Sequence, residues 1–237
     1  MRHRFTDVHQ HLAYGVDDGP RKPEQMYKML EKAARQGIGA IIATPHVTPG
    51  VRRFHREEYE KAVADARAYC AEKGLEIEIL TGCEILYTDQ AARLISEGHV
   101  PTLNYTDYVL VEFSPDIKYA KLYEALEHLV CEGYRPVIAH VERYQCLVRR
   151  PARAERLKRE LEVRYQINCS SIINYKGLFN WYFVNRMLRK RLVDAIGTDA
   201  HNTSTRPANM KEAWRAIKQK YGARYARRLT DGSFLAE

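Results

Sequence analysis

The chain has 237 residues, of which 45% are hydrophobic and 29% charged, with 13 glycines and 9 prolines. This ordinary composition excludes a disordered or fibrous chain, and the length suits a single α/β barrel or doubly wound domain. Lys and Arg outnumber Asp and Glu by 38 to 30, and the net charge of +8 favours anionic partners such as phosphate esters, nucleic acid or acidic membrane surfaces.

Short apolar runs alternate with helical stretches along the chain. Seven runs have the length and composition of strands, and some are apolar throughout, as strands buried on both faces are: 4–9, 39–44, 75–83, 107–113, 136–140, 163–168 and 193–198. Helical stretches rich in Ala, Leu, Glu, Lys and Arg lie between and after them: 23–36, 57–73, 89–97, 120–132, 152–162, 178–191, and one or two more in 206–229. This alternation predicts βα units around a parallel sheet.

Helix-ending glycines support these boundaries. Pro23 suits a first helical turn, and Gly37, Gly74, Gly98 and Gly133 each follow a helical stretch, as C-terminal caps do.

Cysteine usage and apolar run length exclude further classes. The five cysteines include no C-x-x-C pair, which argues against a disulfide framework or a thiolate zinc site. The N-terminus has no apolar signal-peptide core, and no run approaches the roughly 18 apolar residues of a membrane span. We therefore expect a cytoplasmic protein without membrane insertion.

Acidic and histidine side chains follow the ends of six of the seven predicted strands, counting the loop after the first: Asp7, His9, His11, Asp17, Asp18, His46, Glu84, Glu112, His140, Asp199 and His201. The carboxyl ends of barrel strands meet at the face where such enzymes build their active sites. Singly, each motif has a structural interpretation: a turn at Asp17-Asp18-Gly19, a buried acid at Glu112, a core histidine at His140, a helix N-cap at Asp199. Jointly they favour one shared site.

The ligand types in this set indicate metal ions. His9 and His11 alternate in an extended segment, so both point to the same side. Five histidines and four carboxylates exceed what one ion binds, and mixed nitrogen and oxygen donors suit Mn, Fe or Zn better than Ca or Mg. We expect several ions that share carboxylate bridges.

The D-x-H-x-H start at Asp7 resembles the signature of the PHP (polymerase and histidinol phosphatase) superfamily of trinuclear metal phosphoesterases. Within that superfamily the chain is similar to the bacterial capsule-type protein tyrosine phosphatases from about residue 5 to residue 230, in motifs that begin at Val16, Ala43, Glu84, Pro101, Val111, Ile138 and Asp199. The resemblance implies a distorted (β/α)7 TIM-like barrel of the PHP fold, formed by a single domain of residues 1–237.

The resemblance also implies roles for individual residues. Around the first ion it places His9, His11, Glu84 and Asp199. Glu84 would bridge to a second ion held by Glu112 and His140, and the third would be held by Asp18, His46 and His201. It implies that Asp7 and Asp17 orient ligands, and that Arg143 and Arg206 bind phosphate.

The activity implied is hydrolysis of phosphotyrosine by a metal-bridging hydroxide. The implied substrate is a phosphotyrosine protein, namely the C-terminal Tyr-rich tail of a tyrosine kinase that controls capsule or exopolysaccharide assembly. A cysteine-based phosphatase is excluded, because none of the five cysteines stands six residues before an arginine.

Three alternatives remain open: another PHP activity on histidinol phosphate or a small ester, a nucleic-acid-binding or 3′-exonuclease module, and a metal-stabilised scaffold without turnover. We expect no nucleic-acid partner. The sequence leaves the oligomeric state open.

Overall fold

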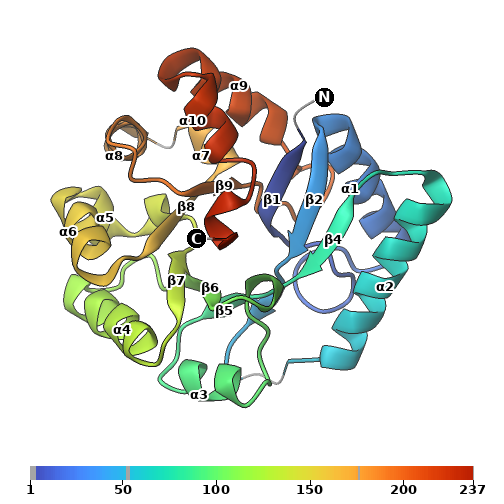
Figure 1. Cartoon of the computed structure of the whole chain (residues 1–237), viewed down its shortest axis with the longest axis horizontal. Coiled ribbons are helices and arrows are strands. Elements are labelled where there is room, and N and C mark those ends of the chain that lie inside the picture. Colours follow the sequence, from blue (N-terminus) through green and yellow to red (C-terminus); the bar gives the residue numbers. More distant parts are fainter. Residues whose placement is uncertain (1–3, 52–53, 176, 237) are drawn as a thin grey trace.

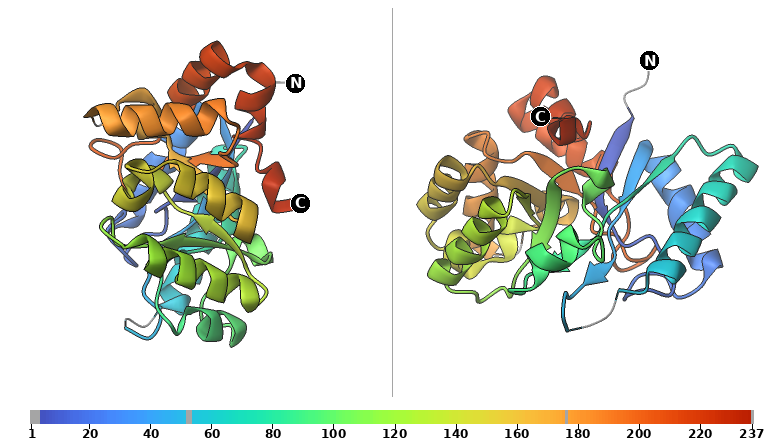
Figure 2. Two further views of the ribbon diagram at one scale, coloured as in Figure 1. Left: turned by 90° about the vertical axis from the view of Figure 1, so that its left-hand side faces the viewer. Right: turned by 60° about the horizontal axis from the view of Figure 1, so that its bottom comes forward.

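The computed structural model describes residues 4–51, 54–175 and 177–236, in which every strand pair is parallel. The strands are β1 Phe5–Gln10, β2 Ile38–Ala43, β3 His46–Val47, β4 Glu78–Thr81, β5 Glu84–Leu86, β6 Tyr108–Glu112, β7 Arg135–Ile138, β8 Arg164–Asn168 and β9 Ala195–Gly197. They lie inside a ring of helices (Figures 1 and 2). A parallel sheet covered by helices was predicted from the alternating pattern, and the structure confirms it.

The strands follow chain order around a distorted barrel. One sheet has the order β1-β2-β4 and the other β3-β5-β6-β7-β8-β9. Two residues separate β2 from β3, and two separate β4 from β5, so two chain segments run through both sheets. At the far edge the Asp199 N–H donates to the His9 carbonyl at 2.8 Å, which joins the end of β9 to β1. The predicted seven-unit barrel is therefore confirmed.

Two predicted strands are each followed, after a break of two residues, by a short strand that was not predicted. The run 39–44 is followed by Pro45, which has no N–H for a sheet ladder, and pairing resumes only at His46. The run 75–83 becomes β4, with β5 beginning separately at Glu84. The breaks turn the chain from one sheet into the other at the positions that precede His46 and Glu84.

Helices cover the outside of the barrel (Figure 2). They are α1 Pro23–Gln36, α2 Arg56–Lys73, α3 Ala91–Ser96, α4 Tyr119–Cys131, α5 Gln145–Val148, α6 Ala152–Leu161, α7 Cys169–Ile173, α8 Gly177–Arg189, α9 Met210–Tyr221 and α10 Ala223–Arg228, with 3₁₀ turns η1 Leu103–Tyr105, η2 Val141–Arg143 and η3 Ser233–Ala236. Gly37 caps α1 with φ of 84°, as predicted. The short α5 and α7 were not predicted, because four or five residues carry no helical periodicity. Across the described part of the chain, no helix is both long and apolar enough to cross a membrane.

The inside of the barrel is closed at one end by the C-terminal segment. A separate apolar cluster fills it, made of Val8, Ile42, Leu103, Tyr108, Leu110, Val137, Ala139, Ala195 and Phe234. The Phe234 ring, from η3, packs edge-on against Tyr108, the first residue of β6, with centroids 5.5 Å apart. Figure 1 shows this end of the chain in the middle of the ring. Because η3 fills the end of the barrel at which the strands begin, a functional site has room at the opposite end, where the strands end.

Tyr59 of α2 ties together the two breaks. Its buried hydroxyl lies 2.9 Å from the Ala43 carbonyl and 3.1 Å from the Gly82 carbonyl, and accepts from the Gly82 N–H at 3.0 Å. We expect Tyr59→Phe to lower the free energy of unfolding by about 1–3 kcal/mol, because buried backbone groups lose a partner. Urea denaturation measures this. Tyr105→Phe, at a ring 84% exposed, should change it by less than about 0.5 kcal/mol; equal effects would contradict the role given to Tyr59.

Candidate metal centre

The nine predicted ligands lie together at the carboxyl end of the barrel. Metal-ligating atoms of the described residues gather in three groups, within 4.8 Å of one another in each. The groups are His9, His11, Glu84 and Asp199; His11, Asp18, His46 and His201; and His46, Glu84 and Glu112. His140 joins the third, since its Nε2 lies 2.7 Å from Glu84 and 3.5 Å from Glu112.

The first group is fully buried and its donors face one another. His9 Nε2 lies 3.1 Å from Glu84 Oε2 and 3.7 Å from Asp199 Oδ1. His11 Nε2 lies 3.2 Å and 3.4 Å from the same two oxygens. Ligands about 2.0–2.2 Å from a shared transition metal are separated by about 3.0–3.5 Å, so the spacing fits such an ion.

Glu84 stands at the centre of the whole arrangement. Its Oε1 faces His140, while its Oε2 lies within 3.2 Å of nitrogens of His9, His11 and His46. Despite this crowding, the buried Oε2 makes no hydrogen bond of acceptable geometry with any described residue. A carboxylate whose two oxygens face different sets of imidazoles has the geometry of a bridging ligand.

Asp18, His46 and His201 surround a second point. Asp18 Oδ1 lies 3.1 Å from His201 Nε2 and 3.5 Å from His46 Nε2. His11 stacks on His201 with ring centroids 3.7 Å apart, but its Nδ1 is bonded to Asp17 and its Nε2 faces the first group. His11 therefore contributes its free nitrogen to the first group.

The two aspartates expected to orient ligands make such contacts. The Asp17 carboxylate accepts from His11 Nδ1 at 2.6 Å and from the His46 N–H at 3.0 Å. Asp7 is fully buried and accepts from the Thr198 N–H at 2.9 Å, next to Asp199. Each carboxylate thus fixes the chain or ring that presents a candidate ligand.

Polar side chains of β8 also belong to the centre, and the sequence analysis missed them. Gln166 is fully buried, and its Oε1 lies 3.1 Å from His9 Nδ1 and accepts from the His140 N–H at 2.7 Å. Asn168 donates to Asp199 Oδ2 at 2.7 Å. Their signal was two amides at the end of a predicted strand, where a buried amide needs a hydrogen-bond partner.

Electrostatics at the centre favour cations. Burial alone would raise the pKa of Glu84, but His9, His140 and His11 hold it well below its ordinary value, so the carboxylate is ionised. Burial and the nearby charges of His11 and Arg206 lower the pKa of His201 to about 4. That imidazole is neutral at pH 7, the form that binds a metal ion.

Two candidate ligands have left-handed backbone conformations. The φ angles of His140 and Asp199 are 32° and 51°, a region that residues other than glycine seldom adopt. Both stand just past a strand end, where hydrogen bonds to Gln166 and Asn168 hold them. Strained positions of this kind gather at functional sites.

Arg143 and Arg206 lie at the rim of the centre. The Arg143 guanidinium pairs with Asp199 Oδ2, and Arg206 pairs with Asp199 Oδ1 at 2.8 Å and with Asp18 at 3.4 Å. Their side chains are 41% and 37% exposed. Both line a cavity of about 860 Å³, together with Asp199, Ser171 and the exposed Phe179 of α8. An anion entering from this cavity meets both arginines beside the metal-ligand groups.

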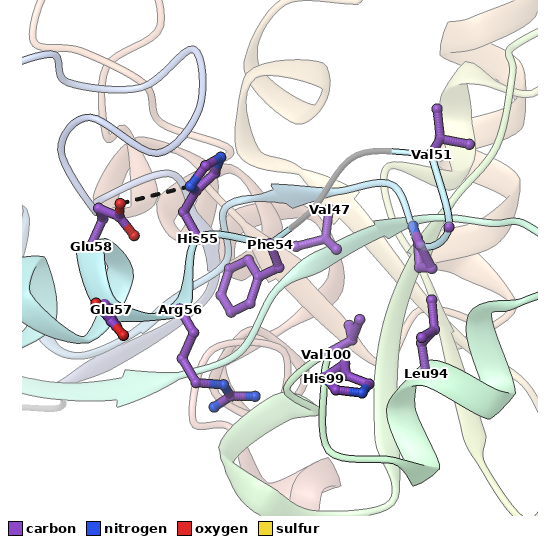
Figure 3. A pocket seen from close by; sticks show the side chains of 12 residues that line it. Val47, Val51, Phe54, His55, Arg56, Glu57, Glu58, Leu94, His99 and Val100 are labelled. Carbon is purple, nitrogen blue, oxygen red and sulfur yellow. Dashed lines mark ion pairs between the residues drawn. The ribbon is translucent and has the colours of Figure 1, made fainter.

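A second cavity, of about 750 Å³, is lined by Val47 of β3 and by residues that follow this strand (Figure 3). Val47, which follows His46, forms part of its wall with Phe54, His55 and His99. His55 pairs with Glu58 at 3.7 Å, and within the described ranges neither histidine belongs to a metal-ligand group. This cavity adjoins the metal centre but lacks its chemistry.

Comparison with known proteins gives consistent relatives. The family model for capsular polysaccharide synthesis, CpsB/CapC, matches residues 5–232. Tyrosine-protein phosphatase CpsB of Streptococcus pneumoniae is 32% identical over 230 residues, 95% of this chain and 94% of that protein. Tyrosine-protein phosphatase YwqE of Bacillus subtilis is 29% identical over 233 residues, 98% and 91% of the two chains.

Solved structures agree with these relatives. A crystal structure from work on YwqE of Bacillus subtilis and CpsB of Streptococcus pneumoniae, described as unique metal-dependent tyrosine phosphatases, has a TM-score of 0.88 at 28% identity and covers 97% of this chain and 93% of its own. Histidinol phosphate phosphatase of Lactococcus lactis, at 17% identity and a TM-score of 0.60 over 94% of each chain, shares the fold.

Proposed function

The chain belongs to the CpsB/CapC family, as its resemblance to capsule-type phosphatases predicted, and from this membership we propose that it is a metal-dependent protein tyrosine phosphatase. The observation that carries the proposal is the position of Glu84, whose two carboxylate oxygens face four histidines. Arg143 and Arg206 lie at the rim of the same centre.

The proposal assigns up to three ions to the three ligand groups. His9, His11, Glu84 and Asp199 would hold the first; Glu84, Glu112 and His140 the second; Asp18, His46 and His201 the third. The donor spacing and mixed nitrogen and oxygen chemistry suit manganese, iron or zinc, and we take manganese as the first candidate.

Bound ions would supply Lewis-acid chemistry, lowering the pKa of water from about 15.7 towards 7 and neutralising phosphoryl oxygens. Residues of the chain itself would bind the phosphate and position the metal ligands. Arg143 and Arg206 present planar forks to non-bridging phosphate oxygens at the cavity mouth. Asn168 and Gln166 keep Asp199 and His9 in place. The leaving phenolate, with a conjugate acid of pKa about 10, needs little help from a general acid.

We propose that the protein acts in the cytoplasm and that its physiological substrate is the Tyr-rich C-terminal tail of a bacterial tyrosine kinase that controls capsule or exopolysaccharide assembly. Relatives named for capsular polysaccharide synthesis support this choice. We further propose that residues 1–237 form one domain, in keeping with a family match that spans 5–232.

The direct test is turnover of para-nitrophenyl phosphate and a phosphotyrosine peptide with added manganese. A phosphoserine peptide, histidinol phosphate and single-stranded DNA serve as competing substrates. The proposal requires the phosphotyrosine peptide to have the highest kcat/KM. Faster turnover of histidinol phosphate or DNA, or metal binding without any turnover, would replace it with one of the alternatives.

We expect activity to survive thiol alkylation and to be lost on chelation, because the cysteines lack phosphatase spacing. Cys131 is exposed and should react, whereas Cys83 is 1% exposed and burial raises its pKa. Iodoacetamide and EDTA treatments followed by manganese readdition measure both effects. Cys83 precedes Glu84, so Cys83→Ser should be active and equally resistant to alkylation; the opposite inhibitor pattern would overturn metal dependence.

A further inference from the structure

A group of cations lies beside the proposed phosphate site and has no role in it. Lys118, Arg149, Arg150 and Arg153 line a surface cavity of about 430 Å³, here called the basic cavity. Its acid is Asp116, which already accepts a hydrogen bond from the Ser114 hydroxyl. Within the described residues Lys118, Arg149 and Arg150 form no ion pair. With four cations and one carboxylate in its lining, the cavity carries a net positive charge.

Two of the four cations of the basic cavity make contacts that restrict their side chains. Arg153 lies over the Tyr119 ring at 4.6 Å and donates to the Cys146 carbonyl at 3.2 Å. Arg149 contacts Gln145 at 3.4 Å. Held side chains lose less conformational freedom when a ligand binds.

The basic cavity also adjoins the cavity that contains Arg143. Gln145 lines both, and its N–H donates to the carbonyl of Pro115, which lines the Arg143 cavity next to Asp116. Arg149 follows Arg143 by six residues, through the extended Tyr144 and the four-residue helix α5. Two extended steps of about 3.3 Å and four helical rises of about 1.5 Å place the two arginines at most roughly 13 Å apart along this path. An extended peptide advances about 3.3 Å per residue, so a separation of two to four residues lies within that limit.

We propose that the basic cavity binds Asp or Glu side chains located two to four positions, on one side, from the phosphotyrosine of a peptide substrate. The inference rests on the proposed function and adds a substrate class to it. Opposed charge at the rim of a binding site raises capture of the ligand. It has little effect on a substrate too small to reach the cavity.

The test compares phosphotyrosine peptides with Asp-Glu or Lys-Lys at these positions, before or after the phosphotyrosine. We expect about 10-fold higher kcat/KM for one acidic peptide at low salt, declining towards equality at about 0.5 M salt, because exposed charges are screened. Equal rates for acidic and basic peptides on both sides would overturn the inference. Since phosphotyrosine would still be hydrolysed in that case, the proposed function would stand.

The variant Arg149→Glu/Arg150→Glu locates the effect. It should abolish the acidic preference and leave para-nitrophenyl phosphate turnover within about twofold. Lys28→Glu/Arg35→Glu reverses the same number of charges on α1, on the opposite side of the ring in Figure 1 from α5, and should keep the preference. Arg149→Gln/Arg150→Gln repeats the test with a milder change. Preference retained in both Arg149/Arg150 variants would place acidic recognition elsewhere and refute the assignment.

Discussion

Glu84→Gln is expected to lower kcat/KM for para-nitrophenyl phosphate by at least about 1,000-fold, because electrostatic stabilisation by the metal centre is lost. The amide keeps the side-chain volume but removes the negative charge that His9, His11, His46 and His140 share. The amide nitrogen of the new side chain, at either of its two terminal positions, would direct N–H groups at imidazole nitrogens. Bound manganese should fall further than in any single His→Ala variant, because Glu84 belongs to more than one ligand group.

Elemental analysis, turnover and melting temperature are measured on the same preparations. Asp194→Asn is the control, since Asp194 is also a buried acid, paired with Lys158 and bonded to the Tyr165 N–H at 2.8 Å, but belongs to none of the described metal-ligand groups. It should lower the melting temperature and keep its metal. Fewer than about two ions per unmodified chain in excess manganese would remove the multinuclear interpretation.

Arg143→Ala and Arg206→Ala are each expected to lower kcat/KM by roughly 100-fold, about 2.7 kcal/mol, with little change in bound metal. Both guanidiniums face Asp199 and line the same cavity, where they would neutralise charge that develops on the phosphoryl group. Lysine should rescue only partly, because an ammonium cannot form the two parallel bonds of a guanidinium.

The contacts of these arginines with Asp199 give the competing outcome. If their role is to hold Asp199, metal and activity should be lost in parallel, and a large excess of manganese should restore turnover. Arg35→Ala, on the exposed face of α1, should leave both quantities unchanged. Wild-type turnover in both Arg143→Ala and Arg206→Ala would show that the phosphate binds elsewhere.

Much of the centre was predictable because barrels place all strand ends on one face. The predicted ends of six strands supplied the nine candidate ligands, and the structure brings all nine together. The short strands β3 and β5 were not predicted, because two or three residues carry no alternating pattern. Gln166 and Asn168 of β8 were missed because side-chain amides are weak metal ligands. Their role here is to position His9 and Asp199.

The sequence by itself determined the βα rhythm, the family and the set of candidate ligands, because apolar periodicity, motifs and donor chemistry are properties of short segments. Tertiary structure alone decided which candidate ligands face the same oxygen. The central position of Glu84 depends on histidines from β1, β3 and β7 meeting across the barrel. The pairing of Arg143 with Asp199, which is 56 residues later, likewise joins segments far apart in the chain. Distances between such segments follow from how the barrel closes and packs, and no local pattern encodes them.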